Sequence, residues 1–400
     1  SSFVTSGSSP GSYHIRKGVK QRMERRERVF RMGISGSYGG MNLGDEAILQ
    51  VMLTELRRSL LVEITVFSRN PQDTLARHRV ERAVPVRELS RGEVTPEIAP
   101  LDLFILGGGG ILYDVEAADY LREVTIAEEL GVPVMLYAVS CGPLQDPEAQ
   151  RLVRSSLNRA EVITVRERPA RRLLEQIGVT REIQVTADPA MLLQPEPLPP
   201  NAIATEGLSG RHRLVGVSVR ERGAAAPDMD EYHYHTMLAN AADYMIDRLD
   251  ADLIFVPMER KVLDMQHSHA VIAQMAHADR AAVLKGEYTP GQILSLVGHF
   301  AFVVGMRLHF LMFAAMQRVP FVALPYASKV SGFLDALDIE MPPAKQVNAG
   351  QLIAYIDRSW DLRNAIQEKI SQALPSLQEQ ARRTSDIAAH LLMGSAAKTQ

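Results

Sequence analysis

The chain alternates short apolar segments with amphipathic segments of helical period, and it does so in two separate blocks. In the first block we predict strands at Val29–Ile34, Val62–Phe67, Leu103–Leu106, Pro133–Val139, Val162–Val165 and Ile183–Thr186. The segment Glu46–Leu60 between the first two carries apolar residues at the spacing of one helix face. Strands that alternate with helices favour a parallel sheet covered on both faces.

A proline-rich segment, Gln194–Pro200, separates the blocks, because its prolines cannot continue a helix or an inner strand. After it we predict strands at Leu214–Val219, Asp252–Val256, Ala281–Leu284, Ala301–Val304 and Phe321–Leu324. Helices are expected near Glu231–Leu249, Asp264–Ala278, Pro290–Val297, Leu308–Gln317 and Val330–Leu337, with a long one over Asp361–Leu392.

Two such blocks in 400 residues predict an α/β fold of two Rossmann-like domains with parallel sheets, the GT-B-like architecture. We expect an N-terminal domain over 29–194, a linker over 195–210, a C-terminal domain over 211–360, and a C-terminal helix and tail over 361–400. Ligands of such folds bind in the cleft at the carboxyl ends of the strands, so the active site is expected between the domains.

Composition limits the partners. The formal net charge of −3 gives no global attraction for nucleic acid, so none is expected as a partner. The single cysteine, Cys141, cannot form an internal disulfide, and no apolar run reaches the ~18 residues of a membrane helix. We therefore expect a cytoplasmic protein.

Residues 1–28 form a serine-, glycine- and then arginine-rich leader that we expect to be disordered. It lacks the apolar core of a secretory signal. One interpretation is a solvated leader. The other is a basic segment that touches anionic lipid head groups, which would place the protein peripherally at the inner face of the plasma membrane.

The first glycine-rich segment lies between a predicted strand and a predicted helix, and its candidate site residues are Gly39, Asn42, Gly44, Asp45 and Glu46. Glycines there allow a ligand to approach the backbone, and a helix N-terminus offers unpaired N–H groups. The two acidic residues have a simpler interpretation as partners of the helix dipole. The segment is neither a dinucleotide fingerprint nor a P-loop.

The second cluster follows the predicted strand Leu103–Leu106 and consists of Gly107, Gly108, Gly109 and Gly110, with Asp114 just beyond. A plain turn needs one or two glycines, so four favour close approach of a substrate or of the opposite domain. A tight crossover under a helix is the structural alternative.

Cationic side chains follow the strands of the second block. Arg220 ends the strand Leu214–Val219, and Arg307 and His309 follow Ala301–Val304 at the start of a helix. An arginine at a strand end can bind an anion in a bidentate manner, and a histidine can transfer protons near neutral pH. Glu259, at another strand end, could orient an arginine or take a proton from a hydroxyl, and Lys329 could contact a phosphate.

No metal site and no cofactor are predicted. The pairs His233 with His235, and His267 with His269, have a spacing that suits a strand but lie in helical or loop segments. Asp188, which precedes a proline, is interpreted as a turn residue.

Taken together, these motifs resemble the polysaccharide pyruvyltransferase family, in the branch that modifies bacterial cell-wall polymers and exopolysaccharides. The resemblance covers residues 33–340 and rests on Asn42-Leu43-Gly44-Asp45-Glu46-Ala47, Gly107–Gly110, Gly305-Met306-Arg307-Leu308-His309, and Lys329 with Gly332-Phe333-Leu334.

The resemblance implies transfer of pyruvate from phosphoenolpyruvate, as a ketal, to two hydroxyls of a cell-surface saccharide or its lipid-linked precursor. It implies donor binding by Arg220, Arg307 and Lys329 in the C-terminal domain and acceptor binding at the glycine-rich segments of the N-terminal domain. His309 is the candidate acid and Glu259 the candidate base. Phosphoenolpyruvate is then a co-substrate, and no cofactor is implied.

Two alternatives remain open. One is a GT-B glycosyltransferase that uses a nucleotide sugar. The other is a non-catalytic sugar- or anion-binding module on the same scaffold.

Overall fold

The computed structural model describes residues 28–211, 213–222, 229–259, 263–324, 328–340 and 347–395. The expected leader, apart from Arg28, lies outside this part, and so does the side chain of Lys329. None of the described helices is both long and apolar enough to span a membrane.

Seven parallel strands form the first sheet, in the order β3-β2-β1-β4-β5-β6-β7. They are β1 (Val29–Ser35), β2 (Leu61–Ser68), β3 (Arg82–Pro85), β4 (Leu103–Leu112), β5 (Val134–Cys141), β6 (Val162–Val165) and β7 (Ile183–Val185). The strand order reverses between β1 and β4, where Ser35 pairs with Leu106. Ligands of open parallel sheets bind outside the carboxyl ends of the strands at such a point.

The helices of the first half are α2 (Leu43–Ser59), α3 (Pro71–Arg77), α4 (Arg91–Ile98), α5 (Ala117–Glu129), α6 (Pro147–Leu157) and α7 (Arg168–Gln176). α2 begins at Asn42, whose side chain accepts hydrogen bonds from the N–H groups of Gly44 and Asp45. This capping satisfies N–H groups that the first helical turn leaves without partners.

The second sheet has five parallel strands in the order β10-β9-β8-β11-β12. They are β8 (Leu214–Ser218), β9 (Asp252–Phe255), β10 (Ala281–Val283), β11 (Phe302–Gly305) and β12 (Phe321–Ala323). The accompanying helices are α9 (Glu231–Leu249), α10 (Asp264–Ile272), α11 (Pro290–Val297), α12 (Leu308–Met316), α13 (Ser328–Ala336) and α14 (Ala349–Asp361), with a 3-10 turn, η2 (Ala278–Arg280), before β10.

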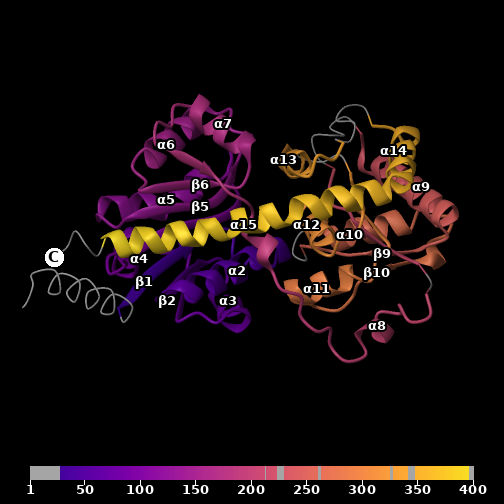
Figure 1. The fold of residues 1–400 in the computed structure, drawn as a ribbon, viewed down its shortest axis with the longest axis horizontal. Coiled ribbons are helices and arrows are strands. Elements are labelled where there is room, and N and C mark those ends of the chain that lie inside the picture. The colour runs from indigo at the N-terminus through magenta and orange to yellow at the C-terminus, as the bar shows by residue number, and fades with distance from the viewer. Residues whose placement is uncertain are drawn as a thin grey trace, which may run out of the picture.

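Between the sheets the chain forms η1 (Pro189–Leu192), passes the proline-rich segment and forms α8 (Ala202–Thr205). Two parallel sheets with helices confirm the predicted α/β fold with two Rossmann-like halves (Figure 1).

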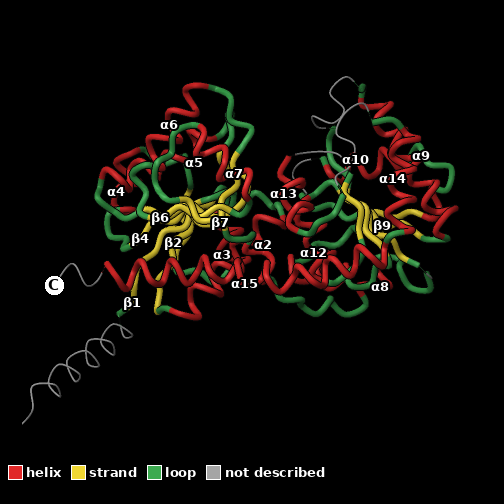
Figure 2. The backbone as a smooth tube through the Cα atoms, turned by 45° about the horizontal axis from the view of Figure 1, so that its top comes forward, coloured by secondary structure: helices red, strands yellow, loops and turns green. Residues whose placement is uncertain are grey.

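The last helix, α15 (Arg363–Ser395), runs back from the second half along the first (Figures 1 and 2). There Thr384 Oγ1 donates to Thr186 Oγ1 at 2.9 Å, and Gln378 Nε2 donates to the carbonyl of Met191 at 3.2 Å. α15 therefore connects the two halves a second time, besides the segment between β7 and β8.

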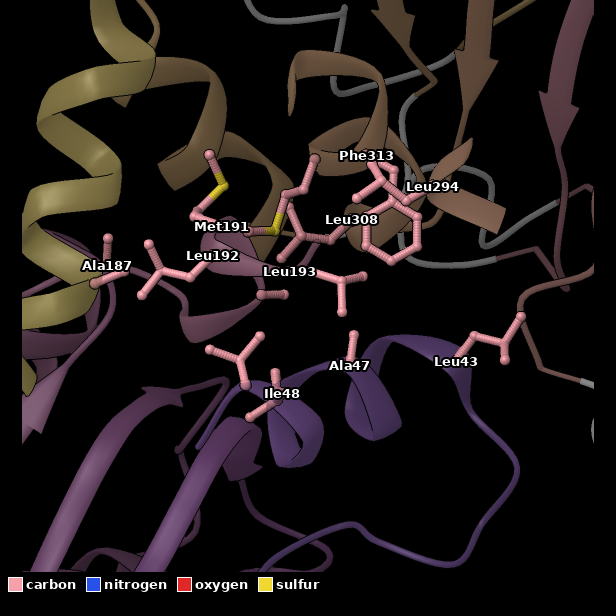
Figure 3. Packing of buried hydrophobic residues seen from close by; sticks show 14 of the residues in the cluster. Leu43, Ala47, Ile48, Ala187, Met191, Leu192, Leu193, Leu294, Leu308 and Phe313 are labelled. Carbon is pink, nitrogen blue, oxygen red and sulfur yellow. The ribbon is translucent and has the colours of Figure 1, made fainter. Parts of the chain in front are cut away.

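One continuous apolar cluster joins the halves. Figure 3 shows this cluster, which includes Leu43 and Ala47 of α2, Met191 of η1, Leu193 just after η1, and Phe313 of α12 from the second half. All five side chains are buried. Because burial of this surface is lost if the halves separate, the cluster fixes their relative position.

The prediction that a strand ends at Leu106 is wrong. β4 continues to Leu112, and Gly107 and Gly109 pair with Tyr137 and Val139 of β5. The glycine run is therefore extended sheet, not a loop. No elements were predicted from the sequence at β3, α3, α4, α5, α8 and α14. β3 has only four residues and ends in Pro85, so it carries little apolar signal.

Candidate active site

A cavity of about 220 Å³ lies between the two halves. The first half lines it with Ser37, Asn42, Asp45, Arg69, Gly110, Tyr113, Glu116, Tyr120 and Arg166. The second half lines it with Arg220, Met258, Glu259, Met306, Arg307, Leu308, His309 and Val330. We call these two sets the N-wall and the C-wall.

The parallel sheets explain why these side chains meet. Arg69 follows β2 directly, Arg166 follows β6, and Arg307 follows the short segment after β11. The carboxyl ends of parallel strands share one edge of a sheet, and the two edges face each other across the cavity. The predicted location of the site, between the halves, thus matches the cavity.

Arg307 is held by two carboxylates. Its Nε donates to Oδ2 of Asp264 at 3.0 Å, and its Nη2 donates to Oδ1 of the same carboxylate. Its Nη1 lies 3.1 Å from Oε2 of Glu259. Asp264 is fully buried and also accepts from the N–H groups of Met258 and Glu259, so it fixes the guanidinium rigidly.

His309 sits in the first turn of α12, and its Nε2 lies 3.3 Å from Oδ2 of Asp188. The same oxygen accepts from Nη1 of Arg166 at 2.7 Å. Burial alone raises the pKa of Asp188, but His309 and Arg166 outweigh burial and hold it well below its usual range. The histidine therefore faces a charged carboxylate.

Asp188 was interpreted from the sequence only as a turn residue. It does cap η1, accepting from the N–H of Ala190 at 2.9 Å. Its second oxygen contacts Arg166 and His309. These contacts could not be predicted from the sequence, because the three residues lie far apart in the chain.

Gly44 explains part of the first glycine-rich segment. An added Cβ at Gly44 would overlap the imidazole of His309, because the first turn of α2 packs directly on that ring. The glycine was predicted to admit a ligand. Instead it admits a side chain from the other half of the chain.

The same segment also connects the two walls. The N–H of Leu43 donates to the carbonyl of Met258 at 2.9 Å, and Nδ2 of Asn42 donates to Oε2 of Glu259 at 3.3 Å. Asn42 thus caps α2 and contacts the carboxylate that pairs with Arg307. Asp45 lines the cavity beside it.

Glu46 does not reach the cavity. It is fully buried, accepts from the N–H of Gly39 at 2.9 Å, and its Oε2 lies 2.6 Å from Nε2 of His78. Gly39 has φ +76°, and a Cβ there would overlap Ser68. Gly39 and Glu46 therefore stabilise the conformation of the glycine-rich segment, and neither lines the cavity.

The glycines of β4 have a similar role. Added Cβ atoms would overlap Tyr38 and Met52 at Gly107, and Ile48 at Gly108, so these glycines let α2 pack closely on the sheet. Gly109 adopts φ +97°.

Of the four glycines Gly107–Gly110 that were predicted as site residues, Gly110 lines the cavity. Asp114 lies outside the lining; it accepts from the N–H groups of Gln145 and Asp146 and orders that loop.

Five N-wall residues were not predicted as site residues from the sequence: Arg69, Tyr113, Glu116, Tyr120 and Arg166. The position after a strand, which identified Arg220, would also have identified Arg69 and Arg166. Burial raises the pKa values of Tyr113 and Tyr120, so both stay neutral phenols.

The arginines differ in their surroundings. Arg220 pairs with Glu221, and Arg166 also contacts Glu167 at 3.0 Å. Arg69 is exposed and donates to the hydroxyl of Ser37 at 2.6 Å. Among the described residues, no carboxylate lies within ion-pair distance of Arg69.

The fold is similar to those of several solved structures. MnaA from S. aureus, solved with UDP, has a TM-score of 0.63 at 12% identity, covering 90% of this chain and 96% of its own. A UDP-GlcNAc 2-epimerase from Neisseria meningitidis bound to UDP-GlcNAc has 0.59 at 10%, covering 92% and 100%. A glycosyltransferase from Rickettsia africae has 0.60 at 10%, covering 91% and 99%. At these identities the likeness shows the fold alone, which is of the predicted GT-B type.

No curated protein matches the chain significantly in sequence. The profile of the family described as polysaccharide pyruvyl transferase matches residues 42–328, which include the N-wall from Asn42 onward and most of the C-wall. That span covers well over half of the 400 residues. The chain therefore belongs to the polysaccharide pyruvyl transferase family.

Proposed function

We propose that the protein transfers pyruvate from phosphoenolpyruvate to two hydroxyls of one saccharide unit, forming a ketal and releasing phosphate. The observation that carries this proposal is the group formed on the C-wall by Arg220, which follows β8, and by Arg307 and His309 at the N-terminus of α12. Phosphoenolpyruvate presents a phosphate and a carboxylate, which arginines and a helix N-terminus both favour.

The carboxylates around Arg307 support this assignment. Asp264 and Glu259 keep its guanidinium in one orientation before any ligand arrives, so little side-chain entropy is lost on binding. They also offset part of its charge. Arg220 on the same wall, and Arg166 and Arg69 across the cavity, supply further positive charge for a donor that carries both a phosphate and a carboxylate.

His309 is the proposed acid. In the first step its proton goes to the methylene carbon of the donor while one sugar hydroxyl adds to the central carbon. In the second, the C–O bond to phosphate breaks and a second hydroxyl closes the ketal. The proton of one sugar hydroxyl restores the proton that the histidine donated. The proton of the other hydroxyl leaves with the phosphate. Asp188 would stabilise the protonated ring.

The N-wall suits the acceptor. Tyr113 and Tyr120 offer aromatic surface, and Glu116 and Asp45 are carboxylates that can accept hydrogen bonds from sugar hydroxyls. Glu259, the C-wall residue that accepts a hydrogen bond from Asn42 of the N-wall, is the proposed base for the first hydroxyl. Lys329 remains a proposed donor ligand.

A second candidate is a GT-B glycosyltransferase that uses a nucleotide sugar. The folds of the structural neighbours solved with UDP or UDP-GlcNAc favour it. A calorimetric comparison of phosphoenolpyruvate with UDP and UDP-sugars separates the two. Saturable binding of phosphoenolpyruvate supports pyruvyl transfer, whereas binding of UDP alone supports the alternative.

Turnover then needs an acceptor. Phosphate release from phosphoenolpyruvate, measured over a panel of aryl glycosides and lipid-linked saccharides, would identify it, and the ketal methyl group is detectable by NMR. Activity confined to lipid-linked acceptors would support the proposed peripheral location at the inner face of the membrane.

A further inference from the structure

Two buried histidines meet outside the cavity, one on α9 and one on α10. Nε2 of His235 lies 2.8 Å from Nδ1 of His267, and the two residues are 5% and 4% exposed. A neutral imidazole has one donor and one acceptor, so a single proton can lie between the rings. Nε2 of His267 is buried and has no hydrogen-bond partner among the described residues. A cation between Nε2 of His235 and Nδ1 of His267 could take the place of the proton that the two rings share.

Glu231 adds a carboxylate to the pair. It stands four residues before His235 on α9, and its Oε1 lies 4.0 Å from Nδ1 of His267, beyond hydrogen-bond distance. One ligand atom from each of the three residues lies within 4.8 Å of the others. In a tetrahedral zinc site, with bonds of about 2.0–2.2 Å, ligand atoms are roughly 3.3 Å apart. The separations of 2.8 and 4.0 Å fall on either side of that value.

The chemistry of the three residues suits a borderline transition metal. Two imidazoles and one carboxylate bind zinc-like ions well, whereas Mg²⁺ and Ca²⁺ prefer oxygen ligands alone. The side chain of Glu231 is 69% exposed, which gives an ion a path from solvent and room for a water ligand.

We propose that Glu231, His235 and His267 bind one divalent cation of the zinc class, which fastens α9 to α10. The reaction does not use this ion, because none of the three residues lines the cavity. α10 begins at Asp264, one turn before His267, and Asp264 holds Arg307. A cation here would therefore steady the helix that positions an arginine of the C-wall.

The sequence predicted no metal site because the spacing within each histidine pair suits a strand, whereas both pairs lie in helical or loop segments. His233 instead contacts Asp230 at the start of α9. The fold brings together one histidine from each pair, which their spacing along the chain does not reveal.

The test uses the full chain, freed of metal by a chelator and then dialysed against Zn²⁺ or Co²⁺. We expect one tightly held equivalent per chain, a higher melting temperature, and visible Co²⁺ absorption typical of a tetrahedral site. Glu231→Gln and His267→Gln should each weaken metal binding by about ten-fold or more. Loss of a residue that only hydrogen-bonds to a metal ligand already costs about that factor, and loss of a ligand itself should cost at least as much. His233→Gln, on the same helix, is the matched control and should bind like wild type.

Two results would overturn the site: no retained equivalent in wild type, or equal binding by wild type and His267→Gln, which would place the ion elsewhere. Because Glu231 is exposed, Glu231→Gln keeps the test decisive even if His267→Gln does not fold. None of these measurements depends on catalytic activity, so the outcome is separate from that of the proposed function.

Discussion

The two walls of the cavity are built differently. On the C-wall, Arg307 is 8% exposed and bound by carboxylates, so its position is set before a ligand arrives. On the N-wall, Arg69 is exposed and has serine partners, and it stands with tyrosines and acidic side chains. A rigid cationic wall suits a small, highly charged donor, and an aromatic wall with carboxylates suits a neutral polyol. On the proposed function, we expect the donor to bind at the C-wall and the acceptor at the N-wall.

The largest effect is expected from the proposed acid on the C-wall. Replacing His309 with glutamine keeps some hydrogen bonding but removes proton transfer, so kcat should fall by roughly 10²–10⁴-fold. Calorimetry should show little change in donor affinity, and the pH profile of kcat should lose one ionisation. Weakened donor binding with intact kcat would make His309 a positioning residue only.

Gly44 tests how the N-terminal half supports the C-wall. In Gly44→Ala the new methyl group would displace the imidazole of His309. Because a displacement of about 1 Å can cost roughly 100-fold in rate, kcat should fall by about that factor.

Gly92→Ala on α4 is the matched control, since nothing lies within 4 Å of an added Cβ there. It should leave kcat unchanged and should not lower the melting temperature. Equal rates in both variants would refute the close packing of α2 on the histidine.

Arg307→Lys keeps the charge of the C-wall but loses the planar fork that Asp264 and Glu259 orient. We expect the dissociation constant for phosphoenolpyruvate to rise by roughly 10- to 100-fold, the equivalent of one charged hydrogen bond. The same change at Arg69, whose partners are serine oxygens, should have a smaller effect. A larger effect at Arg69 would move the donor to the N-wall.

Tyr113→Leu changes the N-wall without touching the arginines. Loss of the aromatic face and the hydroxyl should raise KM for the acceptor by roughly 2- to 10-fold, as for one neutral hydrogen bond. The dissociation constant for phosphoenolpyruvate should stay the same. An effect on the donor alone would contradict the division between the walls.

The smallest effect concerns stability in acid. The pKa of Asp188 lies below that of an unfolded aspartate, about 3.9, so its contribution to stability is complete above that pH and is lost as the pH falls further. The difference in unfolding free energy between wild type and Asp188→Asn should therefore shrink below about pH 4. A difference that stays constant there would show that His309 and Arg166 do not favour the charged carboxylate.

The sequence predicted most strands of both sheets because alternating apolar segments report burial directly. It placed Arg220, Glu259, Arg307 and His309 at strand ends, and the structure brings all four to one cavity. It could not reveal Asp264 or Asp188, because an acidic residue before a helix or a proline is equally typical of a cap or a turn. Asp188 does cap η1, and Asp264 is the first residue of α10, so their contacts with His309, Arg166 and Arg307 depend on the assembled fold.

The glycine-rich segments show the same limit. Their clustering signalled a special backbone, but what approaches each glycine is mostly protein: His309 at Gly44, Ile48 at Gly108 and Tyr38 at Gly107. Single-chain patterns cannot distinguish a ligand from a side chain of a distant element. The packing of α15 on the first half could not be predicted either, because the sequence of a helix does not indicate which domain it packs against.

The most direct test of the account is the calorimetric titration of the protein with phosphoenolpyruvate and with UDP, each in wild type and in Arg307→Lys. We predict saturable binding of phosphoenolpyruvate that the substitution weakens, and no competition by UDP. Binding of UDP that displaces phosphoenolpyruvate, or donor binding unaffected by Arg307→Lys, would contradict the assignment of the C-wall to the pyruvate donor.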